Sequence, residues 1–245
     1  MTNDMNSSQA GDPSRVEAWQ MFDRIAGRYD FLNRLLSLRQ DVRWRKKVLL
    51  HLLEKSDQMV LDVATGTGDV LLTLFSGNPK LKRGIGLDMA REMLKSGRQK
   101  IHRLSLDKKL LLIPGDSLWL PFSSQSFDVI TIAFGIRNLI DIKQGLTEMF
   151  RVLKPGGRLL ILEFSLPRNK LFRKIYLFYF RKILPWLGGV ISGDRYAYRY
   201  LNQTVESFPY GKAFNQIMEA AGFQEVIDFP LSFGITSIYR GDRIG

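Results

Sequence analysis

A short run of small and acidic residues at positions 61–69 is the part of this 245-residue chain best suited to chemistry. Its sequence is LDVATGTGD, an apolar run that leads into a glycine turn. A second acidic residue, Asp88, closes the next apolar run about 20 residues beyond Gly68, a spacing typical of a carboxylate that binds ribose hydroxyls. A glycine pair alone marks many ordinary turns. Turn and acid together predict a Rossmann-like site for an adenosine cofactor.

The turn also discriminates between cofactors. A dinucleotide site has a third glycine for close packing of helix on strand, and Leu71 occupies that position. Such a site also places a pyrophosphate at the helix N-terminus, where Asp69 would repel it. An acidic turn suits a ligand with cationic groups, such as the ammonium and sulfonium of S-adenosylmethionine. We therefore favour a methyl donor over NAD.

Composition excludes several kinds of chemistry. The chain has no cysteine, which rules out disulfides, thiolate metal sites and a thiol nucleophile. Its two histidines, His51 and His102, lack metal-ligand spacing, so no metal site is predicted. The net charge of +12 favours an anionic partner, either nucleic acid or a lipid surface. No run of 18 uncharged apolar residues occurs, so no membrane span is predicted.

The elements that must position these residues follow from the hydrophobic pattern. Residues 1–13 are polar and are predicted to form a disordered tail, not a signal peptide, and residues 14–245 one domain. Apolar residues recur at three and four between 16 and 53, which predicts a helical lid over about 14–55. After residue 59, short apolar runs alternate with helices. This alternation predicts an α/β fold with a mainly parallel sheet.

Seven strands are expected, with the last two forming an antiparallel hairpin at one edge of the sheet. The expected strands are 59–64, 84–88, 110–114, 128–134, 158–164, 225–229 and 236–240. The expected helices between them are 70–75, 89–102, 142–153 and 210–221.

An insertion at about 165–209 interrupts this alternation. Residues 165–193 hold six basic residues and no acidic one, interleaved with aromatic residues. In a helix, Phe172, Ile175, Tyr176, Tyr179 and Ile183 would share one face. One interpretation is a cap helix that packs on the sheet. The other is an interfacial helix whose aromatic residues enter a membrane surface while arginines and lysines contact anionic headgroups.

Two strand ends carry further candidates. Asp116 and Ser117 follow the third strand, where the acid can accept a hydrogen bond from an adenine amine or cap its own turn. The fourth strand ends in FGIRN at 134–138, without the proline-rich turn that amino-nitrogen methyltransferases use to hold a planar amine. Arg137 could stabilise a phenolate or polarise a water. The alternative interpretation is a salt bridge to an acid such as Asp141.

The chain resembles the C-methyltransferases of menaquinone and ubiquinone biosynthesis, the demethylmenaquinone or polyprenyl-benzoquinol methylases. The resemblance extends from about residue 16 to 240, and its most selective parts are FGIRN and LEFS. The motifs are FDRIA at 22–26, YDFLN at 29–33, WRK at 44–46, DVATGTGD at 62–69, GDSLWLPF at 115–122, FGIRN at 134–138, EMFRVLKPGG at 148–157, LEFS at 162–165 and YRYL at 198–201.

The resemblance implies a class I S-adenosylmethionine-dependent methyltransferase fold without a metal. The candidate cofactor-binding residues are Asp62, Gly66, Thr67, Gly68, Asp88, Met89, Asp116, Ser117 and Ala133. Thr65 stands where relatives often carry glycine, and Ala133 where many carry serine, so Ala133 is expected to offer only its backbone. The candidate catalytic residues are Arg137 and Tyr29, the latter on a helix expected to fold over the cofactor.

The expected reaction is C-methylation of a prenylated quinol, demethylmenaquinol first and the methoxybenzoquinol as an alternative or additional substrate. An RNA methyltransferase is suggested by the net charge and disfavoured by the missing cysteine and the missing amine motif, so no nucleic acid partner is expected. A non-catalytic scaffold is the third alternative. A cytoplasmic protein on the inner face of the membrane is expected, and a homodimer is left open.

Overall fold

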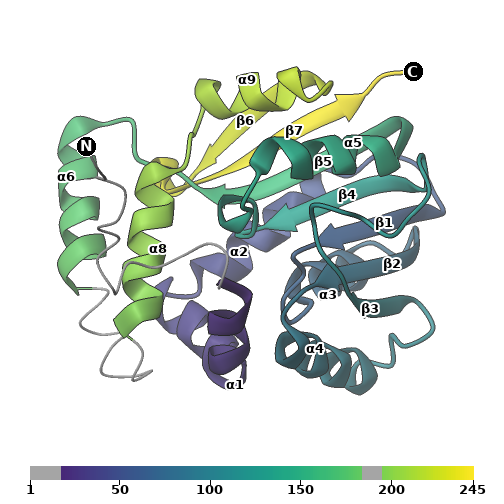
Figure 1. Cartoon of the computed structure of the whole chain (residues 1–245), viewed down its shortest axis with the longest axis horizontal. Helices are drawn as coiled ribbons and strands as arrows, with labels where there is room; N and C mark the ends of the chain where they lie inside the picture. Colours follow the sequence, from purple (N-terminus) through teal and green to yellow (C-terminus); the bar gives the residue numbers. More distant parts are fainter. Residues whose placement is uncertain (1–17, 184–194) are drawn as a thin grey trace, which may run out of the picture.

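The computed structural model describes residues 18–183 and 195–245, and the predicted tail at 1–13 lies outside them. In this part of the chain seven strands form one sheet in the order β3-β2-β1-β4-β5-β7-β6 (Figure 1). The strands are β1 (Gln58–Val63), β2 (Leu81–Asp88), β3 (Leu110–Pro114), β4 (Phe127–Ala133), β5 (Leu153–Phe164), β6 (Gln224–Leu231) and β7 (Thr236–Arg243). Strands β1 to β5 pair in parallel, whereas β7 is antiparallel to both β5 and β6. The predicted fold class is confirmed.

Helices cover both faces of the sheet (Figure 1). They are α1 (Ala18–Leu36), α2 (Gln40–Val48), α3 (Asp69–Gly77), α4 (Arg91–Arg103), α5 (Ile142–Val152), α6 (Lys170–Phe178), α8 (Arg195–Ser207) and α9 (Lys212–Ala220). Alternate residues of β1 point to opposite faces: Val60 packs with α2, α3 and α4, whereas Leu61 packs with α5 and α9. Both faces of the parallel strands are thus buried, which explains their nearly continuous apolar sequence.

The N-terminal helical segment is two helices, not one. The period between 16 and 53 continues through a break at 37–39, where Leu38 (φ 52°) and Arg39 (φ 61°) adopt the left-handed conformation. A short 3-10 turn, Leu49–His51, follows α2. Helix α1 packs on α4, through Ala26 against Ala90 and Met93. The bend places α1 and α2 around the carboxyl ends of the strands.

The insertion contains α6, a π-helical turn at Tyr179–Ile183, and α8 beside it (Figure 1). The five residues expected to share one helix face differ in burial. Tyr176 is buried and stacks on buried Phe180, whereas Ile175 is 59% exposed. Tyr176 and Phe180 thus continue the buried side of α6 into the π-helical turn. Within the described residues no helix is both long enough and apolar enough to cross a membrane.

Candidate active site

The glycine turn lies between β1 and α3. Ala64, Gly66 and Gly68 all have positive φ angles, of 50°, 55° and 77°. Glycine adopts this conformation without strain, and the space where a Cβ of Gly66 would lie is empty to 4 Å. The turn therefore exposes its backbone at Gly66 to open space, where a nucleoside could approach closely.

Asp88 fixes this turn from the end of β2. One carboxylate oxygen accepts from the backbone N–H of Gly66 at 2.8 Å, and the other accepts from that of Ala90 at 2.9 Å. Burial raises the pKa of the Asp88 carboxyl, and these backbone hydrogen bonds oppose the rise. A carboxylate offers about four acceptor positions, so both oxygens can still accept from ribose hydroxyls.

The remaining predicted cofactor residues gather at the same sheet edge. The parallel register aligns Val63 with Leu87 and with Ile132, and Asp88 with Pro114. The segments after β1, β2, β3 and β4 therefore meet there and bring Met89, Asp116, Ser117 and Ala133 beside the turn. Asp116 caps its own turn by accepting from Leu118 N at 2.9 Å. The structure brings the candidates together, and their binding roles stay predictions.

Asp62 lies beneath the turn. Its two oxygens accept hydrogen bonds from the hydroxyls of Thr65 and Thr131, each at 2.6 Å. Burial raises its pKa from 3.8 to about 7, although both hydroxyls oppose the shift. Asp62 therefore anchors Thr65, the first threonine of the turn.

Replacing Asp62 with asparagine should change how stability depends on pH. The folded protein keeps a proton on Asp62 up to about pH 7, whereas an unfolded carboxyl with a pKa of 3.8 loses it earlier. The wild-type free energy of unfolding should therefore fall between these values, and the variant lacks that contribution. Urea unfolding at about pH 4 and pH 8 should show the variant gaining stability relative to wild type at the higher pH. An unchanged difference would contradict the assigned titration.

The structure corrects the interpretation of Asp69. Its carboxylate contacts Lys100 at 2.5 Å, Arg34 at 3.5 Å and Arg45 at 3.6 Å. Burial raises the pKa of Asp69, but the three cations outweigh it and keep the pKa below the usual range. The charge is thus neutralised by the protein, so it cannot select a cationic ligand as the sequence argument assumed.

The same lysine connects the lid to the glycine turn. Lys100 also contacts Asp30 of α1 at 2.5 Å and the hydroxyl of Thr67 at 2.8 Å, and Thr67 donates to Asp30 at 2.8 Å. We call Asp30, Thr67, Asp69 and Lys100 the latch. Because the Thr67 hydroxyl is engaged in the latch, this residue offers a ligand chiefly its backbone.

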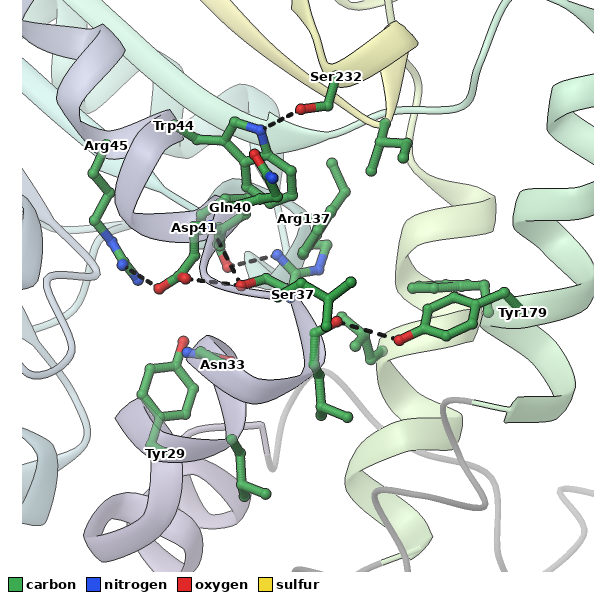
Figure 2. Close-up of a pocket in the computed structure, with 18 of the residues that line it drawn as sticks. Tyr29, Asn33, Ser37, Gln40, Asp41, Trp44, Arg45, Arg137, Tyr179 and Ser232 are labelled. Carbon is green, nitrogen blue, oxygen red and sulfur yellow. Dashed lines mark hydrogen bonds and ion pairs between the residues drawn. The ribbon is translucent and has the colours of Figure 1, made fainter.

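A cavity of about 440 Å³ opens beside the turn, between α1, α2, the ends of β4 and β5, and the insertion (Figure 2). Its lining is mostly aromatic and aliphatic. Figure 2 shows Tyr29, Asn33, Ser37, Asp41, Arg45 and Arg137 on one side of it and Tyr179 on the opposite side. The charged and amide side chains of the lining therefore gather on one side, and the rest of the lining is mostly aromatic and aliphatic.

Arg137 lies in a short 3-10 turn, Ile136–Asn138, directly after β4. It is 4% exposed, and its Nη1 donates to Glu163 Oε1 at 2.8 Å and to the Phe134 carbonyl at 2.6 Å. The predicted alternative partner, Asp141, instead caps α5 by accepting from the N–H of Gln144. Burial raises the pKa of the Glu163 carboxyl, and Arg137 opposes that shift.

The guanidinium of Arg137 has unused donor capacity and an aromatic neighbour. Within the described residues its buried Nε has no hydrogen-bond partner. The guanidinium also lies 5.3 Å from the ring centre of Phe164, which with Phe134 and Trp44 forms an aromatic cluster on the cavity wall. Arg137 can therefore add a hydrogen bond to an aromatic ligand that lies against these rings.

The other predicted catalytic residue, Tyr29, lines the same cavity from α1. Burial raises the pKa of its phenol, opposed by a hydrogen bond with Asn33 and by the charges of Arg45 and Arg137. The phenol therefore stays protonated at neutral pH and can donate a hydrogen bond. The structure thus brings both predicted catalytic residues to one cavity.

Comparison with known proteins assigns the chain to a family. The model of the ubiE/COQ5 methyltransferase family matches residues 9–243. This chain belongs to the ubiE/COQ5 methyltransferase family. The demethylmenaquinone methyltransferase of Thermus thermophilus is 46% identical over 223 residues, which cover 91% of this chain and 100% of that protein. The ubiquinone/menaquinone biosynthesis C-methyltransferase UbiE of Geotalea daltonii is 45% identical over 91% of this chain and 95% of its own length.

Solved structures match the fold at low identity. A possible histamine N-methyltransferase of Thermotoga maritima matches with a TM-score of 0.64 and 19% identity, over 92% of this chain and 99% of its own. The [4+2]-cyclase SpnF matches with a TM-score of 0.65 and 15% identity, over 96% and 98%. A cyclase and a methyltransferase thus resemble this chain in fold, so the fold alone does not decide the reaction.

Sequence reasoning missed most of the polar cavity wall of this ubiE/COQ5 family member. Asn33, Ser37, Asp41 and Arg45 were given no role, although they line the cavity. One signal was present: Asn33, Ser37, Asp41 and Arg45 recur every four residues, a spacing typical of one helix face. Glu163 lies in the LEFS run, but neither its pairing with Arg137 nor that of Lys100 with Asp30 could be predicted, because these partners are distant in the sequence.

Proposed function

We propose that this methyltransferase transfers a methyl group from S-adenosylmethionine to a ring carbon of demethylmenaquinol, forming menaquinol. The observation that carries this proposal is a largely aromatic and aliphatic cavity whose charged and amide side chains gather on one side. There Arg137 of the FGIRN run has guanidinium donor capacity that no described residue uses. A prenylated quinol has the same division, with hydroxyls on an aromatic ring and an apolar remainder. The relatives from Thermus thermophilus and Deinococcus radiodurans bear the name demethylmenaquinone methyltransferase, which supports the naphthoquinol. The corresponding methoxybenzoquinol is the alternative substrate.

The glycine turn fits the nucleoside half of the methyl donor. Gly66 leaves open space over its backbone, and Asp88 is directed at that space with acceptor positions to spare. When bound, S-adenosylmethionine supplies the electrophilic sulfonium methyl group. The protein contributes alignment and exclusion of water, which are the main requirements when a cation and an anion neutralise each other in the reaction.

The roles of the cavity residues follow from their contacts. Glu163 and the Phe134 carbonyl fix the guanidinium of Arg137, and this fixed charge stabilises a quinol oxygen as that oxygen gains negative charge. Tyr29 donates from the lid helix and closes the cavity on that side. Trp44, Phe134 and Phe164 provide flat apolar surface for a fused ring.

The reaction is tested by following methyl transfer from labelled S-adenosylmethionine. Reduced demethylmenaquinol and reduced prenyl-methoxybenzoquinol are offered separately in detergent or liposomes. Product from the first supports the proposal, and product from the second alone replaces the naphthoquinol with the benzoquinol. If neither is methylated while calorimetry shows cofactor binding, the quinol assignment is wrong, and labelled RNA and a scaffold role become the next experiments.

The cavity mouth supports a lipid-facing orientation. Leu38 is 78% exposed and Phe233 is 87% exposed, and both line the cavity. Phe233 contacts Phe172 of α6 with ring centres 5.5 Å apart, which joins the mouth to that helix. Leu171, Ile175 and Phe178 of α6 are also exposed. The basic side chains on and beside α6 are Arg168, Lys170, Arg173 and Lys174. This combination suits an anionic lipid surface from which a prenyl tail can enter.

Introducing negative charge on the exposed apolar face of α6 should weaken membrane binding. The double substitution Leu171→Glu and Phe178→Glu places carboxylates where the acyl boundary would lie, so flotation with liposomes containing anionic lipid should fall at least about tenfold. The control is Leu104→Glu, an exposed leucine at the end of α4, which should bind as wild type does. Wild-type protein that fails to float with these liposomes would refute the lipid-facing orientation.

A further inference from the structure

One carboxylate of the cavity wall has no part in the function described so far. Among the described residues that line the cavity, Asp41 is the only acid, and no histidine accompanies it. It lies in the first turn of α2 and is 4% exposed. The cavity therefore contains a single side chain of the class that usually accepts protons at neutral pH.

Ser37 and Arg45 orient this carboxylate. Ser37 Oγ donates to Asp41 Oδ1 at 2.8 Å, and Arg45 Nη1 donates to Oδ2 at 2.6 Å. The backbone N–H of Asp41 donates back to Ser37 Oγ at 3.3 Å. A serine hydroxyl has one proton and two acceptor positions. Because the proton is given to Asp41 and one acceptor position is used, one position of Ser37 remains, and Ser37 lines the cavity.

The other polar residues of the wall do not serve as bases. Arg137 and Arg45 carry guanidiniums, which stay protonated in proteins. Burial raises the pKa of the Tyr29 phenol, so it is a donor at neutral pH. Asn33 and Gln40 carry amides. Figure 2 shows Ser37 and Asp41 on the same side of the cavity as Arg137 and Tyr29.

We propose that Ser37 and Asp41 form the proton relay that deprotonates the quinol. This inference rests on the proposed function. The quinol hydroxyl gives its proton to Ser37 Oγ while the serine proton passes to Asp41 Oδ1. The electron pair of the ring then forms the new bond from ring carbon to methyl, and the pair of the broken sulfur–methyl bond remains on sulfur. Loss of the ring proton from the methylated carbon and return of a proton to the oxygen restore the aromatic quinol, with one proton released overall.

The surrounding charges are compatible with this role. Arg45 of the same helix contacts Asp41 directly and also contacts Asp69 of α3. The charge of Asp69 is neutralised further by Arg34 and Lys100. Tyr29 of α1 lies near both Arg45 and Arg137. Arg45 and Ser37 hold the two oxygens of Asp41 in place, so the carboxylate is oriented before a substrate arrives. Arg137 lies on the same wall and stabilises the oxygen from which the proton departs.

The decisive variant is Asp41→Asn, assayed for methyl transfer between about pH 7 and 9. Asparagine is isosteric and cannot accept the proton, so kcat at pH 7 should fall by about 100-fold or more with little change in KM. The rate of the variant should then rise about tenfold for each pH unit, because a hydroxyl with a pKa near 10 ionises by itself. The wild-type rate should change little over this range. A deficit that is the same at every pH, or no deficit, would overturn the relay.

A second pair of variants isolates the serine. Ser37→Ala removes the hydroxyl and should show the same pH-dependent deficit, whereas Ser37→Thr keeps a hydroxyl and should retain most activity. Asp141→Asn is the matched control, because it changes a helix-capping aspartate outside the cavity. Calorimetry with S-adenosylmethionine reports folding of each variant. If Asp41→Asn does not bind the cofactor, the pH profile of Ser37→Ala decides the question.

These results separate two failures. Wild-type protein that methylates neither quinol refutes the proposed function, and the relay falls with it. Wild-type protein that turns over, together with a pH-independent loss in Asp41→Asn or Ser37→Ala, refutes only the relay.

Discussion

Replacing Arg137 with methionine, together with Glu163→Gln, should lower kcat for methyl transfer by about 100- to 1000-fold. The reason is that, under the proposed function, the guanidinium of Arg137 stabilises a quinol oxygen that gains charge during the reaction. The affinity for S-adenosylmethionine should stay within about threefold, because Arg137 lies on the cavity wall and not in the glycine turn. Initial rates and calorimetry on the same preparations measure the two effects.

The paired substitution avoids leaving a buried charge without its partner. Arg137 and Glu163 are both buried, and removing the arginine alone leaves an uncompensated buried carboxylate at a cost of about 3–5 kcal/mol of stability. Glu163→Gln removes that charge, so the double variant leaves no unpaired buried charge. If the double variant keeps more than about a third of wild-type kcat, Arg137 has no role in the chemistry.

Replacing Asp88 with alanine should weaken S-adenosylmethionine binding by about 100-fold or more. Two hydrogen bonds from ribose hydroxyls to a charged acceptor contribute about 1.5–3 kcal/mol each. The substitution also removes the acceptor of the Gly66 N–H, so the turn loses its support. Titration calorimetry with the cofactor measures the loss.

Asp116→Asn is the comparison for this experiment. It preserves the size of a neighbouring acid that caps its own turn, and it should weaken binding by less than about tenfold. An Asp88→Ala protein that binds the cofactor as wild type does would place the nucleoside elsewhere. Thermal unfolding without ligand separates the loss of ribose contacts from a general loss of structure.

The sheet and its glycine turn could be predicted because parallel strands buried on both faces leave long apolar runs. The start of the fifth strand was predicted less accurately. The expected fifth strand begins at residue 158, whereas β5 begins at Leu153, because the KPGG segment continues the strand despite the positive φ of Gly156. The strand register shifts between Phe127 and Val129 where this segment pairs.

The two-helix lid could not be predicted from the pattern. Its break contains Leu38 and Arg39 in the left-handed conformation, with no glycine or proline to signal it. The ion-pair partner of Arg137 could not be predicted from the sequence for a different reason. Arg137 has an acid four residues away in Asp141, but its partner is Glu163 on the neighbouring strand. Such pairs depend on strand order, which a single sequence does not display.

Tyr29 and Asp30 are adjacent in α1 and serve different compartments. Tyr29 lines the cavity, whereas Asp30 belongs to the latch over the glycine turn. A helix moves as a unit, so a displacement of α1 that uncovers the turn also withdraws Tyr29 from the cavity. Release of the latch and withdrawal of Tyr29 from the cavity wall would therefore occur together. Through α1, the latch residues Asp30 and Lys100 would influence a cavity that they do not line.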